Sequence, residues 1–264
     1  MVILMVLENN ERAAKIEALL GKKYKLIYYD SVDSTNNIAK NLSREAAQEG
    51  TVILAEKQTS GRGRMGRSFL SEKGGIYLSV LLRPKLSVKT SVRITTAAAV
   101  AAAEVIEELS GKKAQIKWVN DVYIDNLKVA GILTEGAINP ENQMFDYAVL
   151  GIGVNLVKPE GDFPKELKDI AGAVFDEADD EMYAKAVSGI IKRFFYYYKK
   201  IEDNEYIINY RRRLMLTGKE VSYEKDGETH KAKVLGIDDE ARLILEENGK
   251  TVKLSAGEVS VKLC

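Results

Sequence analysis

The sequence predicts an α+β protein in which a mixed, largely antiparallel sheet is flanked by helices and followed by a small C-terminal β domain. Helix-like and strand-like segments alternate through the first 110 residues. Four strand-like segments then follow one another between residues 114 and 154, and their turns are too short for crossover helices. After residue 217, short alternating strands occur without helical periodicity, which indicates a separate β unit.

The first part of the chain is divided by clear helix start and stop signals. Gly21 ends an amphipathic segment, and Ser34 stands at an N-cap position before a helix that we expect to end near Gly50. The expected elements are a helix at 11–20, a strand at 24–29, a helix from 35 and a strand at 51–59.

A long loop follows at residues 59–75, which carry five glycines and four basic side chains without apolar periodicity. Such composition predicts a mobile loop, and long loops are often functional. Beyond it we expect a strand at 76–84, a buried alanine-rich helix at 92–109 and strands at 114–118, 122–125, 128–136 and 145–154. Turn pairs such as Asp125-Asn126 favour an antiparallel meander for these strands.

Two further helices, near 180–200 and 203–214, precede the β-rich tail. No linker rich in Pro, Gly or Ser separates the tail from the rest, so we expect the two parts to pack together. The predicted domains are residues 1–216, with 1–23 as an N-terminal extension, and residues 217–264.

Composition limits the possible chemistry. Lys plus Arg (39) equals Asp plus Glu (39), so no overall field draws this chain of 264 residues to nucleic acid or an acidic membrane. Cys264 and His230 are the only residues of their types, which excludes a disulfide framework and a Cys/His zinc cluster. The apolar start is too short for a signal peptide. We expect a cytoplasmic protein that neither spans a membrane nor binds specific nucleic acid.

The long loop contains a candidate phosphate site. Three glycines allow unusual backbone conformations, and three arginines can bind phosphate oxygens with paired hydrogen bonds. These residues are Gly61, Arg62, Gly63, Arg64, Gly66 and Arg67. A flexible basic loop without a ligand, or a nonspecific RNA-binding tract, remains an alternative.

The meander contains further polar candidates. Lys117, Asn120 and Asp121 stand close together at a turn, although, taken alone, they are better explained as a plain hairpin turn with Trp118 in the core. Period-two alternation predicts that Lys128 shares a strand face with apolar residues.

A last candidate ends the meander, where Gly151, Gly153 and Asn155 follow a buried strand. This segment lacks the third glycine and the helix of a dinucleotide fingerprint, so it indicates close backbone approach to a ligand instead.

Five motifs occur in order: Ser34-Thr35-Asn36, GRGRMGR at 61–67, KWVND at 117–121, K-x-x-G-I-L-x-E from Lys128, and GIGVN at 151–155. In order and spacing they resemble the biotin protein ligase family across nearly the whole chain. The closing SAGEVSVKL resembles the end of that family's small C-terminal barrel. The resemblance implies a class II aminoacyl-tRNA synthetase/biotin ligase-like catalytic domain and an SH3-like β-barrel.

The resemblance also implies the reaction. Biotin and ATP, with Mg²⁺, would give biotinyl-5′-AMP and pyrophosphate, and biotin would then pass to a lysine of a biotin carboxyl carrier protein domain. Lys128 and Arg64 would act on the carboxylate and phosphate charges, and Asp121 is our hypothesis for the base that accepts a proton from the acceptor lysine. No dedicated metal cage is visible in the sequence, and Mg²⁺ would arrive with the phosphates.

Binding roles follow by similarity. Residues implied for biotin are Ser34, Thr35, Asn36, Gln58, Gly61, Arg62 and Lys128. Residues implied for ATP and the adenylate are Arg64, Arg67, Phe69, Lys117, Asn120 and Asn155. Val119 replaces a proline that the family usually has, and Lys262 replaces a common arginine.

Two rivals stay open: a lipoate-protein ligase, which uses related adenylate chemistry, and a noncatalytic biotin sensor. Because only 33 residues precede Ser34, we expect no N-terminal DNA-binding domain and no repressor role. Relatives in the family are often homodimers, and composition does not decide this point.

Overall fold

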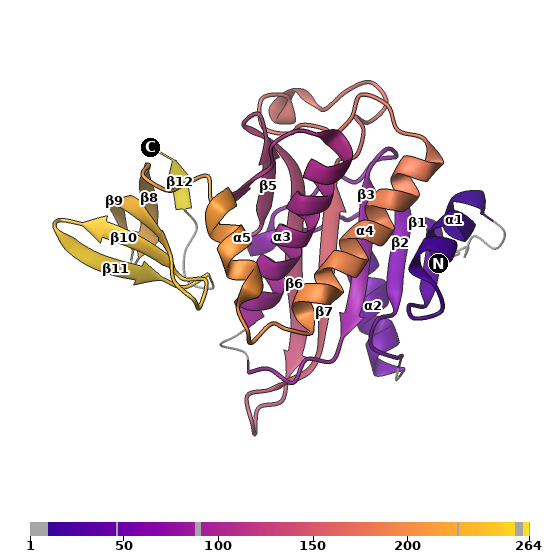
Figure 1. The fold of residues 1–264 in the computed structure, drawn as a ribbon, viewed down its shortest axis with the longest axis horizontal. Helices are drawn as coiled ribbons and strands as arrows, with labels where there is room; N and C mark the ends of the chain where they lie inside the picture. The colour runs from indigo at the N-terminus through magenta and orange to yellow at the C-terminus, as the bar shows by residue number, and fades with distance from the viewer. Residues whose placement is uncertain (1–9, 46, 88–90, 226, 257–260, 264) are drawn as a thin grey trace.

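A computed structural model describes residues 10–45, 47–87, 91–225 and 227–256, and the backbone of 261–263. In these residues, a seven-stranded sheet lies beside a five-stranded sheet (Figure 1). The large sheet has the order β1-β2-β3-β7-β6-β5-β4. Its strands are β1 (Leu26–Val32), β2 (Val52–Gln58), β3 (Ile76–Leu82), β4 (Gln115–Lys117), β5 (Asp121–Ile124), β6 (Leu127–Ile138) and β7 (Phe145–Val154).

The large sheet is mixed, as the sequence predicted. Only β1 and β2 pair in parallel, and the remaining neighbours pair antiparallel. The predicted meander is confirmed, since β4, β5, β6 and β7 are consecutive neighbours joined by short turns. Asp125 and Asn126 both have positive φ, as the tight turn between β5 and β6 requires.

Helices cover both faces of this sheet (Figure 1). One face packs against α1 (Glu11–Leu20), α3 (Ser91–Ser110), α4 (Asp180–Tyr198) and α5 (Glu205–Arg213). The opposite face packs against α2 (Thr35–Arg44), whose Ile38 and Ala39 are buried against strand side chains. The alanine-rich centre of α3 is completely buried, because small side chains let α4 and the sheet approach it closely.

The helix after Ser34 ends earlier than we predicted. The structure ends α2 at Arg44, not near Gly50. Arg83 donates hydrogen bonds to the carbonyls of Ser43 and Ala47, so a distant side chain satisfies backbone groups that further helical turns would otherwise use.

The small domain contains β8 (Glu220–Lys225), β9 (Glu228–Ile237), β10 (Leu243–Glu247), β11 (Lys250–Leu254) and β12 (Val261–Leu263). The order is β11-β10-β9-β8-β12, with antiparallel pairing throughout. Within the residues described, no pairing joins the edge strands β11 and β12. The predicted closed barrel therefore stays a prediction.

The two domains pack together, as expected. A single cluster of buried hydrophobic residues continues from the large sheet into the small one. The Trp118 indole N–H donates to the Ala241 carbonyl at 2.9 Å, and Arg211 donates to the Ile237 carbonyl at 3.1 Å. Trp118 thus joins the β4–β5 turn to the small domain.

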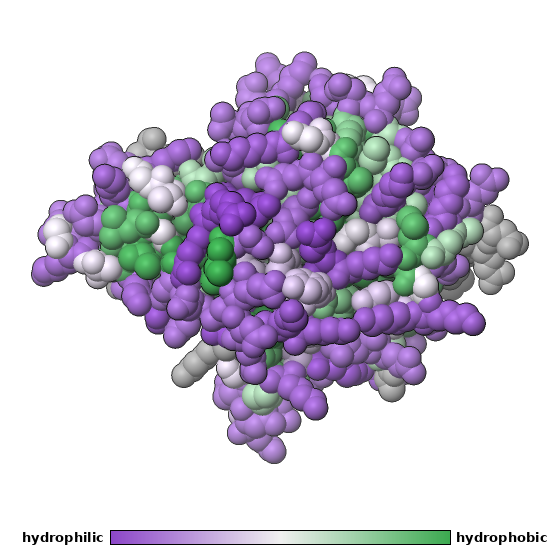
Figure 2. Space-filling model, viewed as in Figure 1, coloured by the Kyte–Doolittle hydropathy of each residue, from purple (hydrophilic) through white to green (hydrophobic). Residues whose placement is uncertain are grey.

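The outer surface over α3 and α4 is largely hydrophilic, whereas hydrophobic side chains gather over the small sheet (Figure 2). In the described ranges, no helix is both long and apolar enough to cross a bilayer.

Candidate active site

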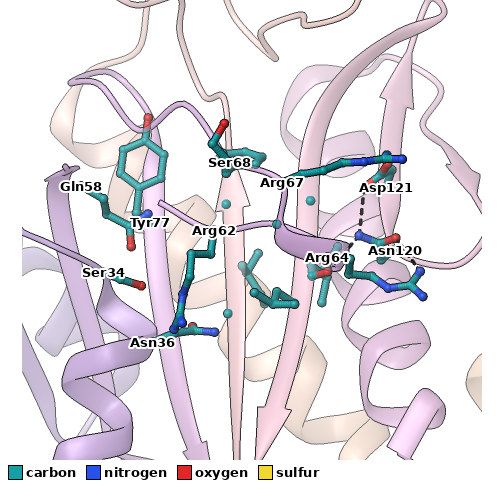
Figure 3. A pocket seen from close by; sticks show the side chains of 18 of the residues that line it. Ser34, Asn36, Gln58, Arg62, Arg64, Arg67, Ser68, Tyr77, Asn120 and Asp121 are labelled. Atoms are coloured by element: carbon teal, nitrogen blue, oxygen red, sulfur yellow. Dashed lines mark hydrogen bonds between the residues drawn. The ribbon is translucent and has the colours of Figure 1, made fainter. Parts of the chain in front are cut away.

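A pocket opens on the face of the large sheet that carries α2 (Figure 3). The start of α2, strands β2, β3, β6 and β7, the loop at 59–75 and the β4–β5 turn all contribute to its wall. The predicted site residues that line it are Ser34, Thr35, Asn36, Gln58, Arg62, Arg64, Arg67, Phe69, Lys117, Asn120, Asp121 and Lys128. Segments far apart in sequence therefore meet in one cavity.

One side of the pocket is polar, and we call it the uncharged side because its one cation, Arg62, is paired with Glu135 at 3.1 Å. Ser34, Thr35 and Asn36 are almost fully buried at the start of α2. Ser34 is the N-cap residue, but its side chain makes no capping hydrogen bond. Gln58 Oε1 accepts a hydrogen bond from Thr35 N at 2.8 Å, and Gln58 Nε2 donates to Ser71 Oγ at 2.9 Å.

The loop at 59–75 forms a tight hairpin over the pocket. Phe69 N donates to the Gly61 carbonyl at 2.9 Å, and Gly63 N donates to the Arg67 carbonyl at 2.7 Å. Gly61 does not line the pocket; a Cβ there would lie 2.4 Å from the Phe69 carbonyl oxygen, so its role is to let the hairpin close. The structure shows an ordered arrangement for a loop that we predicted to be mobile, and its mobility stays a prediction.

Phe69 lies against the backbone of the central strands. A Cβ added at Gly153 would lie 2.6 Å from Phe69 Cε1, and one at Gly131 would lie 3.2 Å from Phe69 Cε2. The edge of Tyr77 faces this ring at a centroid distance of 6.4 Å. The glycines predicted to allow close ligand approach therefore admit an aromatic ring of the protein itself.

The other side of the pocket is cationic. Lys128 Nζ forms an ion pair with Asp121 Oδ1 at 2.7 Å. Arg64 donates to Asn120 Oδ1 at 3.3 Å and also to the Ala256 carbonyl of the small domain. Burial lowers the pKa of Arg64, and the charge of Asp121 acts against this shift.

Lys117 adds a further cation to this side. Burial lowers the pKa of its ammonium, while Asp121 opposes the shift and the positive charge of Lys128 adds to it. Several cations around one carboxylate make a site suited to binding additional negative charge.

The orientation of Lys128 differs from the sequence prediction. A register shift between Val122 and Tyr123 pairs Tyr123 with Lys128 and Val122 with Ala130. This bulge breaks the period-two alternation. Lys128 therefore shares the pocket face with Gly131, whereas Ala130 belongs to the core on the opposite face.

Asn155 lies beside the pocket but does not line it. Its Nδ2 donates to the Gly172 carbonyl at 3.0 Å and to the Lys128 carbonyl at 3.4 Å. Lys128 N also donates to the Ile170 carbonyl at 2.8 Å. Asn155 thus contacts the backbone of Lys128, and its predicted contact with a nucleotide stays a prediction.

Three polar residues around the pocket were missed from the sequence. Ser79 is completely buried and contacts Thr35 and Asn36. Tyr77 lines the wall, and Glu135 accepts hydrogen bonds from Asn36 and Lys40. Glu135 ends the K-x-x-G-I-L-x-E motif, two strand periods beyond Gly131, which was an available signal.

The structure offers few metal ligands. No group of three or more His, Cys, Asp or Glu side chains that could hold a metal ion occurs in the part of the chain described. Among the described residues that line the pocket, Asp121 is the single carboxylate.

Comparison with known proteins adds to this geometry. The profile of the Biotin/lipoate A/B protein ligase family matches residues 28–155, and that of the Biotin protein ligase C terminal domain matches residues 217–262. The chain is 34% identical over 245 residues to the bifunctional ligase/repressor BirA of Bacillus subtilis (strain 168), covering 89% of this chain and 74% of that protein.

The chain belongs to the biotin protein ligase family. It is also 30% identical to the biotin–[acetyl-CoA-carboxylase] ligase of Mycobacterium tuberculosis, over 87% of both chains. Among solved structures, the biotin protein ligase from Aquifex aeolicus in complex with biotin and ATP is similar with a TM-score of 0.77 and 26% identity, covering 91% of this chain and 99% of that one. The family assignment and the ligase activity predicted from the motif order are confirmed.

Proposed function

We propose that this biotin protein ligase activates biotin with ATP in this pocket and transfers it to a lysine of a biotin carrier domain of a carboxylase. The main support is that the pocket has two chemically different sides. Figure 3 places Ser34, Asn36 and Gln58 on one side and Arg64, Asn120 and Asp121 on the other. A ligand with a polar uncharged head and an anionic tail matches this division.

The uncharged side suits the ureido ring of biotin. A cyclic urea carries two N–H donors and one carbonyl acceptor. Ser34 and Thr35 supply hydroxyl groups that are nearly fully buried, where an unmatched polar group would cost binding energy, and the half-buried Gln58 supplies an amide.

The cationic side suits adenylation. A biotin carboxylate oxygen attacks the α-phosphorus of ATP, and the bond to pyrophosphate breaks. Lys128 would contact both the carboxylate and the α-phosphate and stabilise the charge that accumulates between them. Arg64, Arg67 and Lys117 would neutralise the remaining phosphate charge, while Asn120, Phe69 and Asn155 would contact the nucleoside.

The loop hairpin would then cover the adenylate and exclude water from the mixed anhydride. In the second half-reaction the acceptor lysine attacks the biotinyl carbonyl and AMP leaves. Asp121 would accept the proton of that lysine, whose ordinary pKa is about 10.4.

Mg²⁺ fits this pocket as a partner of the phosphates, because Asp121 is the one carboxylate that the described part of the wall supplies. Bound there, it would supply additional charge neutralisation. Asp121 and water would complete its oxygen ligands.

The carrier domain would dock on an exposed strand edge. Within the described residues, β5 pairs with β6 only as far as Gly131, whereas β6 continues to Ile138. The second half of β6 therefore offers an edge close to the pocket. The edge strand β4 is less suited to docking, because another backbone segment already contacts its edge: Met215 N donates to the Ile116 carbonyl.

The domain division belongs to the same proposal. Residues 1–216 would form the catalytic domain, with 1–23 as an extension, and residues 217–264 an SH3-like barrel. The enzyme would act in the cytoplasm, on a carrier protein and without specific nucleic acid.

The decisive experiment measures the mass of a carrier domain after incubation with the protein, Mg·ATP and either biotin or lipoate. We expect a biotin-sized increase that Lys128→Ala abolishes and that Lys185→Ala, on the distant helix α4, leaves intact. A lipoate-sized increase alone would reassign the substrate. Biotin binding without pyrophosphate release would instead favour a noncatalytic sensor.

A further inference from the structure

Glu135 lies behind the uncharged side of the pocket and is not part of its wall. Its Oε1 accepts from Lys40 Nζ at 2.7 Å, and its Oε2 accepts from Asn36 Nδ2 at 2.7 Å and from Arg62 at 3.1 Å. About three quarters of its side chain is buried, since the exposed fraction is 25%. Glu135 therefore lies where it can determine the orientation of the Asn36 side-chain amide.

A carboxylate determines how the Asn36 amide is turned. An amide can direct either its oxygen or its NH₂ group toward a given neighbour, and the neighbours decide which. Because ionised Glu135 can only accept, the NH₂ group must point to it. The oxygen of Asn36 then faces Ser79 Oγ at 2.6 Å.

The charge on Glu135 is maintained by its partners. Burial would raise the pKa of this carboxyl group, but hydrogen bonds from Lys40 and Asn36 lower it below the ordinary value of 4.5. Glu135 is therefore ionised at neutral pH.

The orientation of the Asn36 amide also fixes the direction of the hydrogen bonds at Ser79 and Thr35. Ser79 has one hydroxyl hydrogen, and the Asn36 oxygen has none, so Ser79 donates to Asn36. Two acceptors compete for the single hydroxyl hydrogen of Thr35: Ser79 Oγ at 2.8 Å and Gln58 Oε1 at 3.0 Å. Because the hydrogen of Ser79 is already used on Asn36, the contact between Ser79 and Thr35 is a hydrogen bond only when Thr35 donates to Ser79. The lone pairs of Thr35 Oγ1 are left for a ligand.

Without Glu135 the same atoms support the reverse direction. The Asn36 amide could turn and donate to Ser79, Ser79 would donate to Thr35, and Thr35 would donate to Gln58 Oε1, 3.0 Å away. Lone pairs on both Thr35 and Gln58 would then be occupied by the protein. The wall would have fewer acceptors for a ligand.

We infer that Glu135 is a positioning residue that keeps this wall rich in acceptors and so selects ligands with N–H donors, such as the cyclic urea of biotin. The inference rests on the proposed function. Gly151 supports it, because a Cβ there would lie 2.4 Å from Asn36 Oδ1, so the glycine leaves room for the amide in this position.

The test compares the dissociation constants of biotin and of a biotin analogue methylated on one ureido nitrogen, measured by calorimetry. The bulk of the methyl group is common to all variants. The dissociation constant of the analogue divided by that of biotin therefore reports recognition of the N–H. We expect Glu135→Ala to reduce this ratio by about tenfold, the scale of one hydrogen bond. Glu135→Gln, which can still accept from Asn36, should retain most of the ratio.

Two controls separate this role from general support of the fold. Glu181→Ala removes a surface ion pair on α4 and should leave the ratio unchanged. Ser79→Ala interrupts the connection to Thr35, so Glu135→Ala should have no further effect on the ratio in that background. Equal weakening of both ligands by Glu135→Ala would overturn the inference. Failure of the unaltered protein to bind biotin would instead overturn the proposed function.

Discussion

Lys128 is held in place mainly through its backbone. Its N–H donates to the Ile170 carbonyl at 2.8 Å, and its carbonyl accepts from Gly172 N at 2.9 Å. Asn155 joins the same carbonyl, and the bulge in β6 turns the side chain into the pocket. A flexible four-carbon side chain thus starts from a rigid origin, which limits the positions its charge can reach.

The pairing of Asp121 with Lys128 leads to the first prediction at the residue scale. Asp121→Asn removes the proposed base but retains a side chain of the same size. We expect transfer from preformed biotinyl-adenylate to slow by about 100-fold, within the usual range for general base catalysis. Single-turnover kinetics with the isolated adenylate would measure this step. An unchanged transfer rate would remove Asp121 from that role.

Gly153 gives a second prediction. Because an added Cβ would lie 2.6 Å from Phe69 Cε1, Gly153→Ala must displace the ring. We expect a loss of stability of about 1–3 kcal/mol, typical of overpacking, together with weaker adenylate binding. Thermal unfolding and adenylate titration would show both effects. Phe69→Leu in the same chain should recover part of the stability, and no recovery would argue against this contact as the cause.

At this scale the sequence predicted the charged residues of the pocket wall better than the residues that lie behind them. Lys128, Arg64 and Asp121 could be predicted because their charges and motif positions suit phosphate chemistry. Glu135 and Ser79 could not, because their importance comes from contacts across 99 and 43 positions of sequence. No local pattern encodes such distances.

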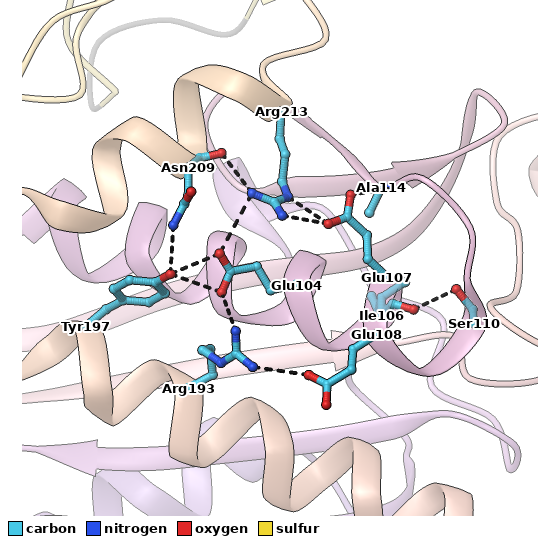
Figure 4. Close-up of polar contacts among 10 residues, drawn as sticks. All are labelled: Glu104, Ile106, Glu107, Glu108, Ser110, Ala114, Arg193, Tyr197, Asn209 and Arg213. Atoms are coloured by element: carbon cyan, nitrogen blue, oxygen red, sulfur yellow. Dashed lines mark hydrogen bonds and ion pairs between the residues drawn. The ribbon is translucent and has the colours of Figure 1, made fainter.

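Among the elements, helices α3, α4 and α5 are joined by a charged network (Figure 4). Arg213 contacts Glu107 at 2.6 Å and Glu104 at 3.8 Å, and only 13% of its side chain is exposed. Tyr197 donates to Glu104, and hydrogen bonding to this carboxylate adds to burial in raising the pKa of Tyr197 to about 12. The network holds α5 against the helix that supports the central strands.

This network predicts that two adjacent arginines at the end of α5, Arg212 and Arg213, contribute differently to stability. Arg213→Met would leave Glu107 without its cation, whereas Glu104 keeps its ion pair with Arg193 at 2.9 Å, and we expect a loss of about 2 kcal/mol in the free energy of unfolding. Arg212 is exposed, so Arg212→Met is the matched control and should change stability by less than about 0.5 kcal/mol. Urea unfolding would measure both, and equal losses would contradict the assigned role of Arg213.

Element positions were largely predictable because they depend on local signals. Gly21 and Gly111 end helices as expected, and the meander strands follow their turn residues. The end of α2 was not predictable, since Arg83, directly after β3, donates to the Ser43 carbonyl near that end. The acceptors of Arg211 and Arg213, the Ile237 carbonyl and Glu107, also lie in distant elements, so no local signal indicates them.

For the whole molecule, acidic groups in both domains link stability to pH. Arg242 lowers the pKa of Asp238, although burial acts in the opposite direction, and the pKa of Glu135 is also lowered. A carboxyl group with a lower pKa in the folded state stabilises the fold above its unfolded pKa. This contribution is lost as the pH falls through the folded value.

We therefore expect the free energy of unfolding to fall as the pH drops below about 4.5, the ordinary value for Glu. Asp238→Asn should lower stability at pH 6 and flatten the decline toward pH 3, because it removes one titrating group. Urea unfolding across this range would measure both slopes. A decline as steep as that of the unaltered protein would exclude Asp238 as a contributor.

The order of strands in the large sheet lay beyond local signals. The pairing of β3 with β7 joins segments about 70 residues apart, and β1 pairs with β2 across the whole of α2. The resemblance to a known family implied the type of domain, and the strand order itself was not predicted. Hydrophobic alternation indicates which face of a strand is buried, but not which strand lies beside it.

The hydrogen bond from Trp118 to Ala241 also makes the protein its own spectroscopic reporter. Trp118 is the only tryptophan, lines the pocket and touches the small domain. Its indole emission should therefore change when a nucleotide enters or when the two domains separate, without any attached dye. Emission spectra of the unaltered protein with and without ligand would report occupancy of the pocket. Spectra of Ala241→Pro would report the contact between the domains, and the two changes can then be compared.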